Sequence, residues 1–187
     1  MNARAAVFLD RDGTLNEECG YLTRPEQMRL LAGAAEGVRL LRAAGLACVV
    51  VTNQSAVGRG LMTQDDLERV HAEMVRQLQA DGAALDGLYY CPATSDDDSE
   101  RKPAPGMLLR AAREMNLDLA RSWMIGDAAR DVLASRRAGC RGAVLVRSGH
   151  DIAEALALLG DTDAVAANLV EAARIIVACS AALASNK

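Results

Sequence analysis

The chain has 187 residues, of which 51% are hydrophobic, 25% are charged and only 3% are aromatic. This length suits one α/β domain, so we expect residues 1–187 to form a single domain with an aliphatic core. The net charge is −4 and no basic block is present, so no nucleic-acid partner is expected. No apolar run approaches the roughly 18 residues of a membrane span, which argues against a membrane partner.

The five cysteines are scattered along the chain without the close spacing of a metal or redox motif. This pattern does not favour a disulfide framework. The first apolar run begins within a few residues of Met1, so we expect no signal peptide. We therefore predict a cytoplasmic protein with reduced thiols.

Apolar runs that are typical of buried strands alternate with helical patterns. The runs lie at residues 5–10, 46–52, 86–91, 122–126 and 142–147, and the helical patterns at 34–44, 63–81, 105–116 and 128–138. This alternation predicts an α/β fold with a doubly wound, Rossmann-like parallel sheet.

The C-terminal part of the chain adds a predicted edge strand and a last helix. Residues 164–166 form the strand, and Asn168 with Glu171 makes a capping pair for a helix that runs to about Leu183. The helix is apolar over much of its surface. We expect it to pack on the sheet rather than to form a dimer contact, and we expect a monomer.

Local signals mark the ends of the other helices and limit what the connections hold. Gly45 suits a helix end, Thr63 with Asp66 makes a capping box, and Pro105 fits a first helical turn. The connections between the first three strands have room for loops and single helices. We therefore expect no large cap domain over the active site.

Polar side chains lie after or beside four of the predicted strands. In chain order they are Asp10 and Asp12, Thr52 and Asn53, Arg101 and Lys102, and Asp127 and Asp131. Because ligands bind at the carboxyl ends of the strands in open parallel sheets, we expect these groups to meet at one edge.

Asp10 and Asp12 indicate covalent catalysis. Two neighbouring carboxylates repel each other and need a cation or a shared proton between them. Asp10 is predicted to attack phosphorus and form an aspartyl-phosphate, which splits one difficult displacement into two easier ones. Asp12 is predicted to protonate the leaving alkoxide and then to deprotonate the attacking water.

The acidic side chains of this edge also predict a Mg²⁺ site, because Mg²⁺ prefers oxygen ligands. We expect Asp10, Asp127 and the backbone carbonyl of Asp12 to bind the ion. Asp131 is expected to lie nearby or to reach the ion through water.

The remaining groups suit a phosphate. Lys102 and Thr52 are predicted to hold its non-bridging oxygens, with Asn53 as a further hydrogen-bond donor. Each motif alone is more often turn chemistry or solvated surface, but four in this order favour phosphoryl transfer.

The four motifs resemble those of the haloacid dehalogenase (HAD) superfamily over residues 5–147, and the second acid, Asp12, resembles its phosphatase and phosphomutase branches. More specific likeness is carried by Phe8–Asn16, Gly20-Tyr21, Val51–Ser55, Arg59-Gly60, Asp86–Pro92, Arg101–Pro103, Pro105–Leu108 and Leu145–Gly149. These segments resemble the D-glycero-D-manno-heptose-1,7-bisphosphate 7-phosphatases and, nearly as closely, the histidinol-phosphate phosphatases. The resemblance implies a HAD-like, capless phosphatase that depends on Mg²⁺.

The same resemblance implies a small phosphorylated sugar as the partner, a heptose bisphosphate of lipopolysaccharide synthesis. Arg59, Arg101 and Arg147 fit a substrate with a second anionic group, which favours a bisphosphate. Histidinol phosphate or another small phosphomonoester is the alternative substrate. A catalytically weak phosphate-binding protein that kept the fold is the alternative of another class.

Two positions depart from the pattern of these relatives. They usually carry a zinc loop of three Cys and one His, whereas residues 91–100 offer only Cys91 and no histidine, so zinc is not expected. They also tend to have a lysine after the metal-binding aspartate, where this chain has Ala128. The loss of that positive charge is expected to weaken phosphate binding.

Overall fold

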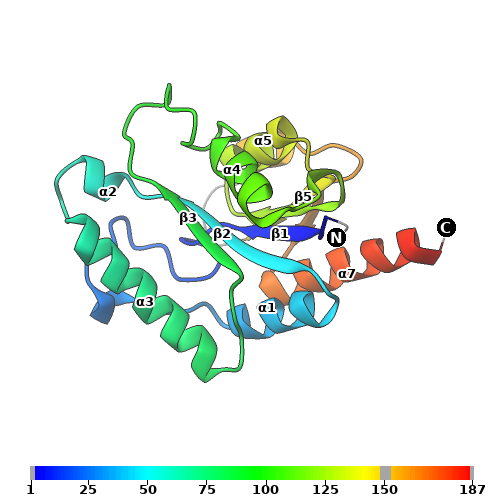
Figure 1. The fold of residues 1–187 in the computed structure, drawn as a ribbon, viewed down its shortest axis with the longest axis horizontal. Helices are drawn as coiled ribbons and strands as arrows, with labels where there is room; N and C mark the ends of the chain where they lie inside the picture. The colour runs from blue at the N-terminus through cyan, green and yellow to red at the C-terminus, as the bar shows by residue number, and fades with distance from the viewer. Residues whose placement is uncertain (1–2, 148–152, 186–187) are drawn as a thin grey trace.

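Six parallel strands form one sheet with helices on both of its faces (Figure 1). The computed structural model describes residues 3–147 and 153–185. The sheet order is β3-β2-β1-β4-β5-β6, with β1 Ala6–Leu9, β2 Ala47–Asn53, β3 Gly87–Cys91, β4 Trp123–Gly126, β5 Gly142–Val146 and β6 Ala164–Ala166. All six predicted strands and the doubly wound parallel topology are therefore confirmed.

Seven α-helices connect or follow these strands in the described residues. They are α1 Ala34–Ala43, α2 Ser55–Gly58, α3 Gln64–Ala80, α4 Gly106–Met115, α5 Ala129–Ala138, α6 Ala153–Ala157 and α7 Leu169–Ser185. The five longer ones match the predicted helices within a few residues. Helices α2 and α6 were not predicted, because a helix of four or five residues is too short to show a hydrophobic period.

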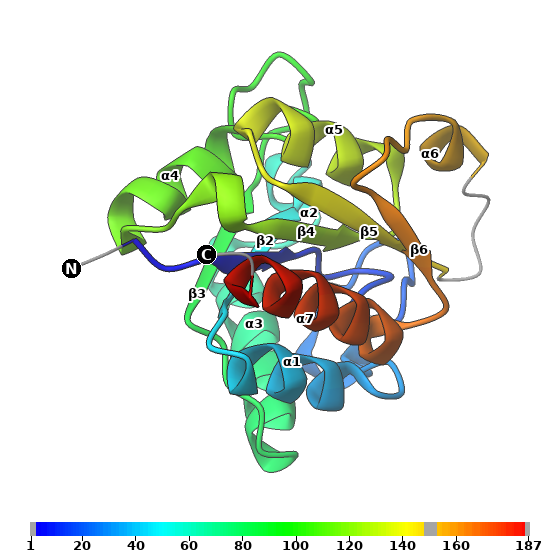
Figure 2. The same cartoon turned by 90° about the vertical axis from the view of Figure 1, so that its right-hand side faces the viewer.

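The two faces of the sheet carry separate hydrophobic cores. In β1, Val7 and Leu9 pack toward α1, α3 and α7, whereas Ala6 and Phe8 pack toward α4 and α5. Figure 2 shows these two helical layers on opposite sides of the strands. Because successive side chains of a strand point to opposite faces, an unbroken apolar run is what a sheet buried on both faces requires.

Most of the residues that were predicted to begin or end helices do so in the structure. Thr63 and Asp66 exchange the hydrogen bonds of a capping box, and Gly45, with a φ of 82°, follows the end of α1. Pro105 precedes α4 instead of lying in its first turn. At α7 the side chain of Asn168 accepts a hydrogen bond from the backbone of Glu171 at 3.0 Å.

The last helix packs on the body of the protein, as predicted. Ala172, Ala173 and Ile176 of α7 are fully buried, and α7 contacts α1 and the strands beneath it.

Across the described residues, no helix has both the length and the apolar character that a membrane crossing needs.

The sheet topology places the ends of β1 and β4 at a point where the chain changes direction across the sheet. The connections from β1 run to β2 on one side, while β4 lies on the other side of β1. Such a switch point is where open α/β sheets bind ligands. No inserted domain covers it in the described residues, and the nearest projecting segment is the loop after β3, green at the top of Figure 1.

Candidate active site

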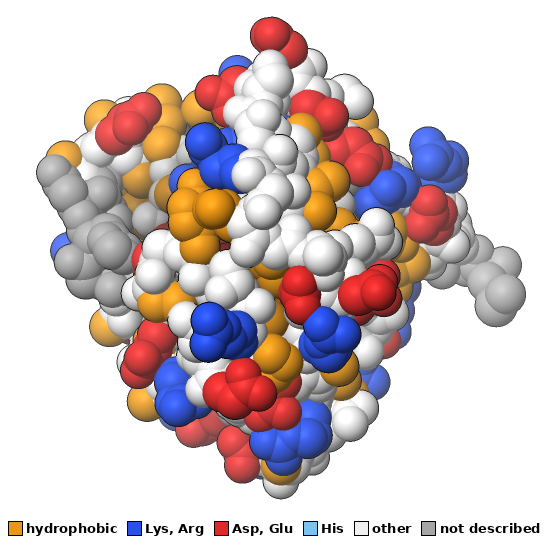
Figure 3. Space-filling model, turned by 90° about the vertical axis from the view of Figure 1, so that its left-hand side faces the viewer, with side chains coloured by type: hydrophobic (Ala, Val, Ile, Leu, Met, Phe, Trp, Pro, Cys, Tyr) orange, Lys and Arg blue, Asp and Glu red, His pale blue; other side chains and the backbone are white. Residues whose placement is uncertain are grey.

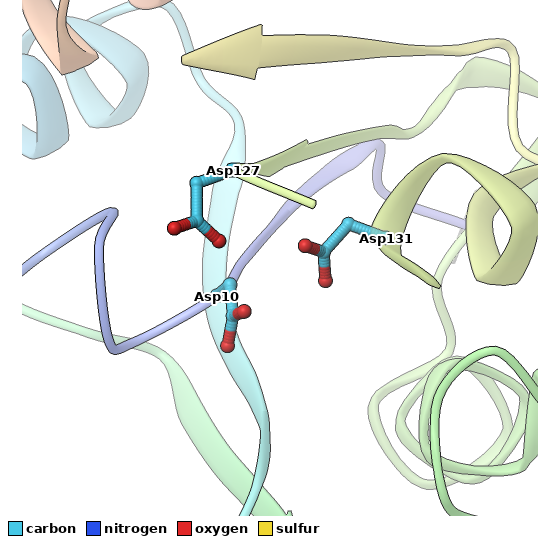
Figure 4. Close-up of side chains that lie close together, drawn as sticks. All are labelled: Asp10, Asp127 and Asp131. Carbon is cyan, nitrogen blue, oxygen red and sulfur yellow. The ribbon is translucent and has the colours of Figure 1, made fainter. Parts of the chain in front are cut away.

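Three carboxylates converge at this switch point. Asp10 follows β1, Asp127 follows β4, and Asp131 is the third residue of α5 (Figure 4). All three are buried, and one oxygen of each lies within 4.8 Å of the others. The structure thus brings together three of the four residues that were predicted to form a metal site.

Lys102 lies against two of these carboxylates. Its Nζ is 2.9 Å from Asp10 Oδ1 and 2.7 Å from Asp131 Oδ1, and its side chain is fully buried. Burial alone lowers the pKa of Lys102, but the two carboxylates outweigh that effect and raise its pKa above the ordinary value. Lys102 therefore keeps its charge inside the protein.

Asn53 positions this lysine through the backbone. Its side-chain amide donates to the carbonyl of Lys102 at 2.9 Å and accepts from the amide of Lys102 at 3.0 Å. The peptide bond between Lys102 and Pro103 is cis. The paired hydrogen bonds join the end of β2 to the loop that carries Lys102, which explains why a polar residue ends that strand.

Burial is also the largest influence on the pKa of the Asp10 carboxyl. It raises the pKa of the Asp10 carboxyl, with Lys102 opposing the shift and Asp131 reinforcing it. The ion pairs of Lys102 do not by themselves offset three buried carboxylates, since each isolated charge carries a large desolvation cost. The cluster therefore has the charge and the oxygen donors that suit a divalent cation.

Asp12 points to a different set of partners. Arg11 grips its carboxylate with Nη2 at 2.8 and 2.9 Å from the two oxygens, and Asn16 and Gln54 donate further hydrogen bonds at 3.0 and 2.9 Å. Burial raises the pKa of Asp12, but Arg11 and these hydrogen bonds outweigh it and lower the pKa. The Asp12 side chain is held as a carboxylate, apart from the three-carboxylate cluster.

Gly126 allows Asp131 to fold back over the end of β4. A Cβ at this position would lie 2.3 Å from Cγ of Asp131, and Asp131 Oδ2 accepts from the backbone of Ala128 at 3.1 Å. The glycine is thus required by a close approach and not by an unusual φ.

We expect Gly126→Ala to lower the free energy of unfolding by about 1–3 kcal/mol, the usual cost of overpacking, and to displace Asp131. Urea unfolding measures the loss, and Gly160→Ala is the control because its Cβ would meet its nearest atom at an ordinary 3.6 Å. Equal stability of the two variants would contradict the close packing of Asp131 on β4.

A cavity of about 150 Å³ opens beside the carboxylates. Of the predicted residues, Asp10, Asp12, Thr52, Asn53 and Arg101 line it. Lys102 is buried behind Asp10 and is not part of this lining. The structure therefore gathers most of the predicted groups around one small cavity.

Two predicted arginines lie elsewhere. Arg59 directly follows α2, is exposed and does not line the cavity. Arg147 lines a second cavity with Gly13 and Asn168, and the Ser148 and Gly149 of its motif lie outside the described residues.

Several other residues that line the cavity were given no role from the sequence. They are Arg11, Tyr21 and Gln54, which lie in segments that carry the family resemblance, and Glu18 and Arg130, which lie outside those segments. Gln54 directly follows the Thr52-Asn53 pair, and Arg130 stands between Asp127 and Asp131, so proximity to a predicted motif was the available signal.

The face at which the strands end shows acidic and basic side chains interspersed (Figure 3).

Arg101 connects the loop after β3 to the site. Its Nε lies 2.9 Å from the exposed Asp96, and its Nη1 donates to the carbonyl of Ala93 at 3.0 Å. Cys91, the last residue of β3, is buried, and its thiol lies 3.6 Å from Asp98 of this loop. The expectation that this loop holds no zinc stays a prediction.

Comparisons with known proteins agree with this architecture. The model of the HAD-hydrolase-like family matches residues 99–172. A D-glycero-beta-D-manno-heptose-1,7-bisphosphate 7-phosphatase of Pasteurella multocida is 40% identical over 158 residues, which cover 81% of this chain and 86% of that protein. A D-glycero-D-manno-heptose-1,7-bisphosphate 7-phosphatase of Thermosynechococcus vestitus is 42% identical over 158 residues, or 78% of this chain and 80% of that one.

The fold has a solved counterpart as well. The crystal structure of the D,D-heptose 1,7-bisphosphate phosphatase from B. bronchiseptica, complexed with magnesium and phosphate, superposes with a TM-score of 0.83 at 30% identity. The match covers 93% of this chain and 98% of that one.

Proposed function

Because the chain belongs to the HAD-like family of the D-glycero-D-manno-heptose-1,7-bisphosphate 7-phosphatases, we propose that it removes the 7-phosphate of D-glycero-D-manno-heptose 1,7-bisphosphate. The observation that carries this proposal is the buried cluster of Asp10, Asp127 and Asp131 against Lys102 at the edge of the sheet. By resemblance, the product serves lipopolysaccharide synthesis in the cytoplasm.

Asp10 is the nucleophile in this proposal. Its carboxylate oxygen forms a bond to phosphorus, and the bond from phosphorus to the sugar oxygen breaks, which leaves an aspartyl-phosphate. Lys102, held by Asn53, supplies a fixed positive charge beside the reacting oxygen. Thr52 lies at the same cavity and donates to the phosphoryl oxygens.

Asp12 is the general acid and the general base in this proposal. Asp12 binds a proton before the first step, in which it gives that proton to the leaving alkoxide. In the second step its carboxylate takes a proton from the water that attacks the phosphorus of the aspartyl-phosphate, and this restores the protonated form. The hydrogen bonds from Arg11, Asn16 and Gln54 that lower its pKa favour the carboxylate. They therefore suit the second step, in which this carboxylate accepts the proton.

The donor set fits Mg²⁺. We propose that Asp10 and Asp127 hold the ion together with the backbone carbonyl of Asp12, and that Asp131 lies beside it. When bound, the ion neutralises negative charge where the phosphate meets the carboxylates. This arrangement lets a negatively charged nucleophile approach a negatively charged substrate.

Phosphate release from a panel of substrates with Mg²⁺ tests the proposed function. The panel holds heptose 1,7-bisphosphate, a heptose monophosphate, histidinol phosphate and other sugar phosphates. We expect the highest kcat/KM on the bisphosphate. A higher value on histidinol phosphate would favour the alternative substrate, and no release from any compound would favour the phosphate-binding alternative.

We expect Arg101→Ala to lower kcat/KM about tenfold on a bisphosphate and less on a monophosphate, because only the former offers a second charge to the guanidinium. Lys102→Ala is the comparison. Because Lys102 contacts the phosphate that every substrate shares, its loss should lower kcat/KM on the bisphosphate and on the monophosphate alike. Equal losses from Arg101→Ala would place Arg101 at the shared phosphate and remove the physical reason for preferring a bisphosphate.

We expect Asp12→Asn to lower kcat by about 10²–10⁴-fold, the usual contribution of general acid–base catalysis. An amide keeps hydrogen bonds to its neighbours but does not carry the proton. Steady-state kinetics measure the loss, and an unchanged kcat in the folded variant would assign proton transfer to another group.

A further inference from the structure

The cations around the cavity differ in whether they already hold a partner. Arg11 grips Asp12, Lys102 contacts Asp10 and Asp131, and Arg101 is bound to the loop after β3. Each of these three side chains therefore already has an oxygen partner within the protein.

Arg130 is the exception. It is the second residue of α5 and lines the cavity together with Asp10 and Asp12. It also lines an adjoining cavity with Asp127, so it stands between the carboxylate cluster and the open side of the site. Among residues 3–147 and 153–185, its guanidinium makes no hydrogen bond or ion pair, and its side chain is exposed.

The charges that face Arg130 are mostly negative. Asp10, Asp127, Asp131 and Glu18 all act on it electrostatically. Ala128 and Ala129 carry no charge, so Arg130 is the basic side chain that the start of α5 brings to the cavity. A phosphate dianion that enters beside Asp10 would meet this guanidinium at the mouth of the cavity.

We propose that Arg130 binds the phosphate group that is transferred, as a substrate-binding residue of the site. Its guanidinium donates charge-assisted hydrogen bonds to non-bridging oxygens on the solvent side, opposite the buried Lys102. The inference rests on the proposed phosphatase function but not on the identity of the sugar, because the phosphate is common to every substrate. In this position Arg130 supplies the positive charge that Ala128 lacks.

This role has a consequence for metal binding that a structural role does not share. In the absence of phosphate, Arg130 places a positive charge near the carboxylates that are proposed to hold Mg²⁺. Its removal should therefore weaken phosphate binding and strengthen Mg²⁺ binding. A general disturbance of the site would weaken both.

The test measures both affinities by calorimetry in wild-type protein, Arg130→Gln, Arg130→Lys and the control Arg113→Gln. Arg113 is an exposed residue of α4 that does not line the cavity. With Mg²⁺ present, we expect Arg130→Gln to bind inorganic phosphate about ten- to a hundredfold more weakly, the range for a hydrogen bond to a charged group. Without phosphate, we expect it to bind Mg²⁺ more tightly, while Arg130→Lys keeps part of the phosphate affinity.

Steady-state kinetics distinguish whether Arg130 binds the transferred phosphate or a second phosphate of the substrate. Arg130→Gln should lower kcat/KM by a similar factor on a bisphosphate and on a monophosphate. A loss confined to the bisphosphate, a loss of both phosphate and Mg²⁺ affinity, or affinities equal to those of Arg113→Gln would each overturn the proposal. If wild-type protein with Mg²⁺ neither binds phosphate nor hydrolyses any phosphomonoester, the proposed function itself fails, and the assignment of Arg130 falls with it.

Discussion

Asp10→Asn should abolish turnover, with kcat reduced by at least about 10⁴-fold, because the neutral amide does not form an aspartyl-phosphate. Asn has nearly the same shape, and Lys102 keeps its contact with Asp131 at 2.7 Å. The substitution also removes one of three buried carboxylates that repel one another. We therefore expect the variant to fold and to be no less stable than the wild type.

The measurement is phosphate release by the purified variant, with circular dichroism and thermal unfolding as checks of the fold. Asp65→Asn is the matched control, since Asp65 is an exposed acid in the first turn of α3 and its loss should leave kcat unchanged. Activity of folded Asp10→Asn within about tenfold of the control would refute the assignment of Asp10 as the nucleophile.

Metal removal should have an effect of similar size. We expect EDTA to abolish activity and added Mg²⁺ to restore it, because the three carboxylates lie within 4.8 Å of one another and the ion pairs of Lys102 reach only Asp10 and Asp131. Calorimetry should find one Mg²⁺ site in the wild type and much weaker binding in Asp127→Asn, with Asp65→Asn again as the control. Full turnover in EDTA would show that the carboxylates work without a metal.

The same preparations test the loop of residues 91–100. Elemental analysis should find no stoichiometric zinc, because one cysteine without a histidine is far short of a tetrahedral site. One tightly held zinc per chain would show that residues outside this loop complete a zinc site together with Cys91.

Several expectations from the sequence stay predictions. They concern the single domain over residues 1–187, the monomeric state, the cytoplasmic location and the roles of the individual site residues.

The strands, the longer helices and the meeting of Asp10, Thr52 and Asp127 at one edge were determined by the sequence alone. Hydrophobic period and capping signals are local, so they are readable from neighbouring residues. Parallel strands that alternate with helices then bring their carboxyl ends to one edge of the sheet. The position of a polar residue directly after a strand is enough to place it there.

What these side chains do at the edge was decided by the tertiary structure. Gln54 reaches Asp12, 42 positions away in the chain, and Asn53 engages the backbone of Lys102, 49 positions away. Arg59 lies off the cavity, whereas Arg130, which no motif distinguished, lines it. A side chain's direction depends on packing against elements remote in sequence, and the local pattern carries no information about that packing.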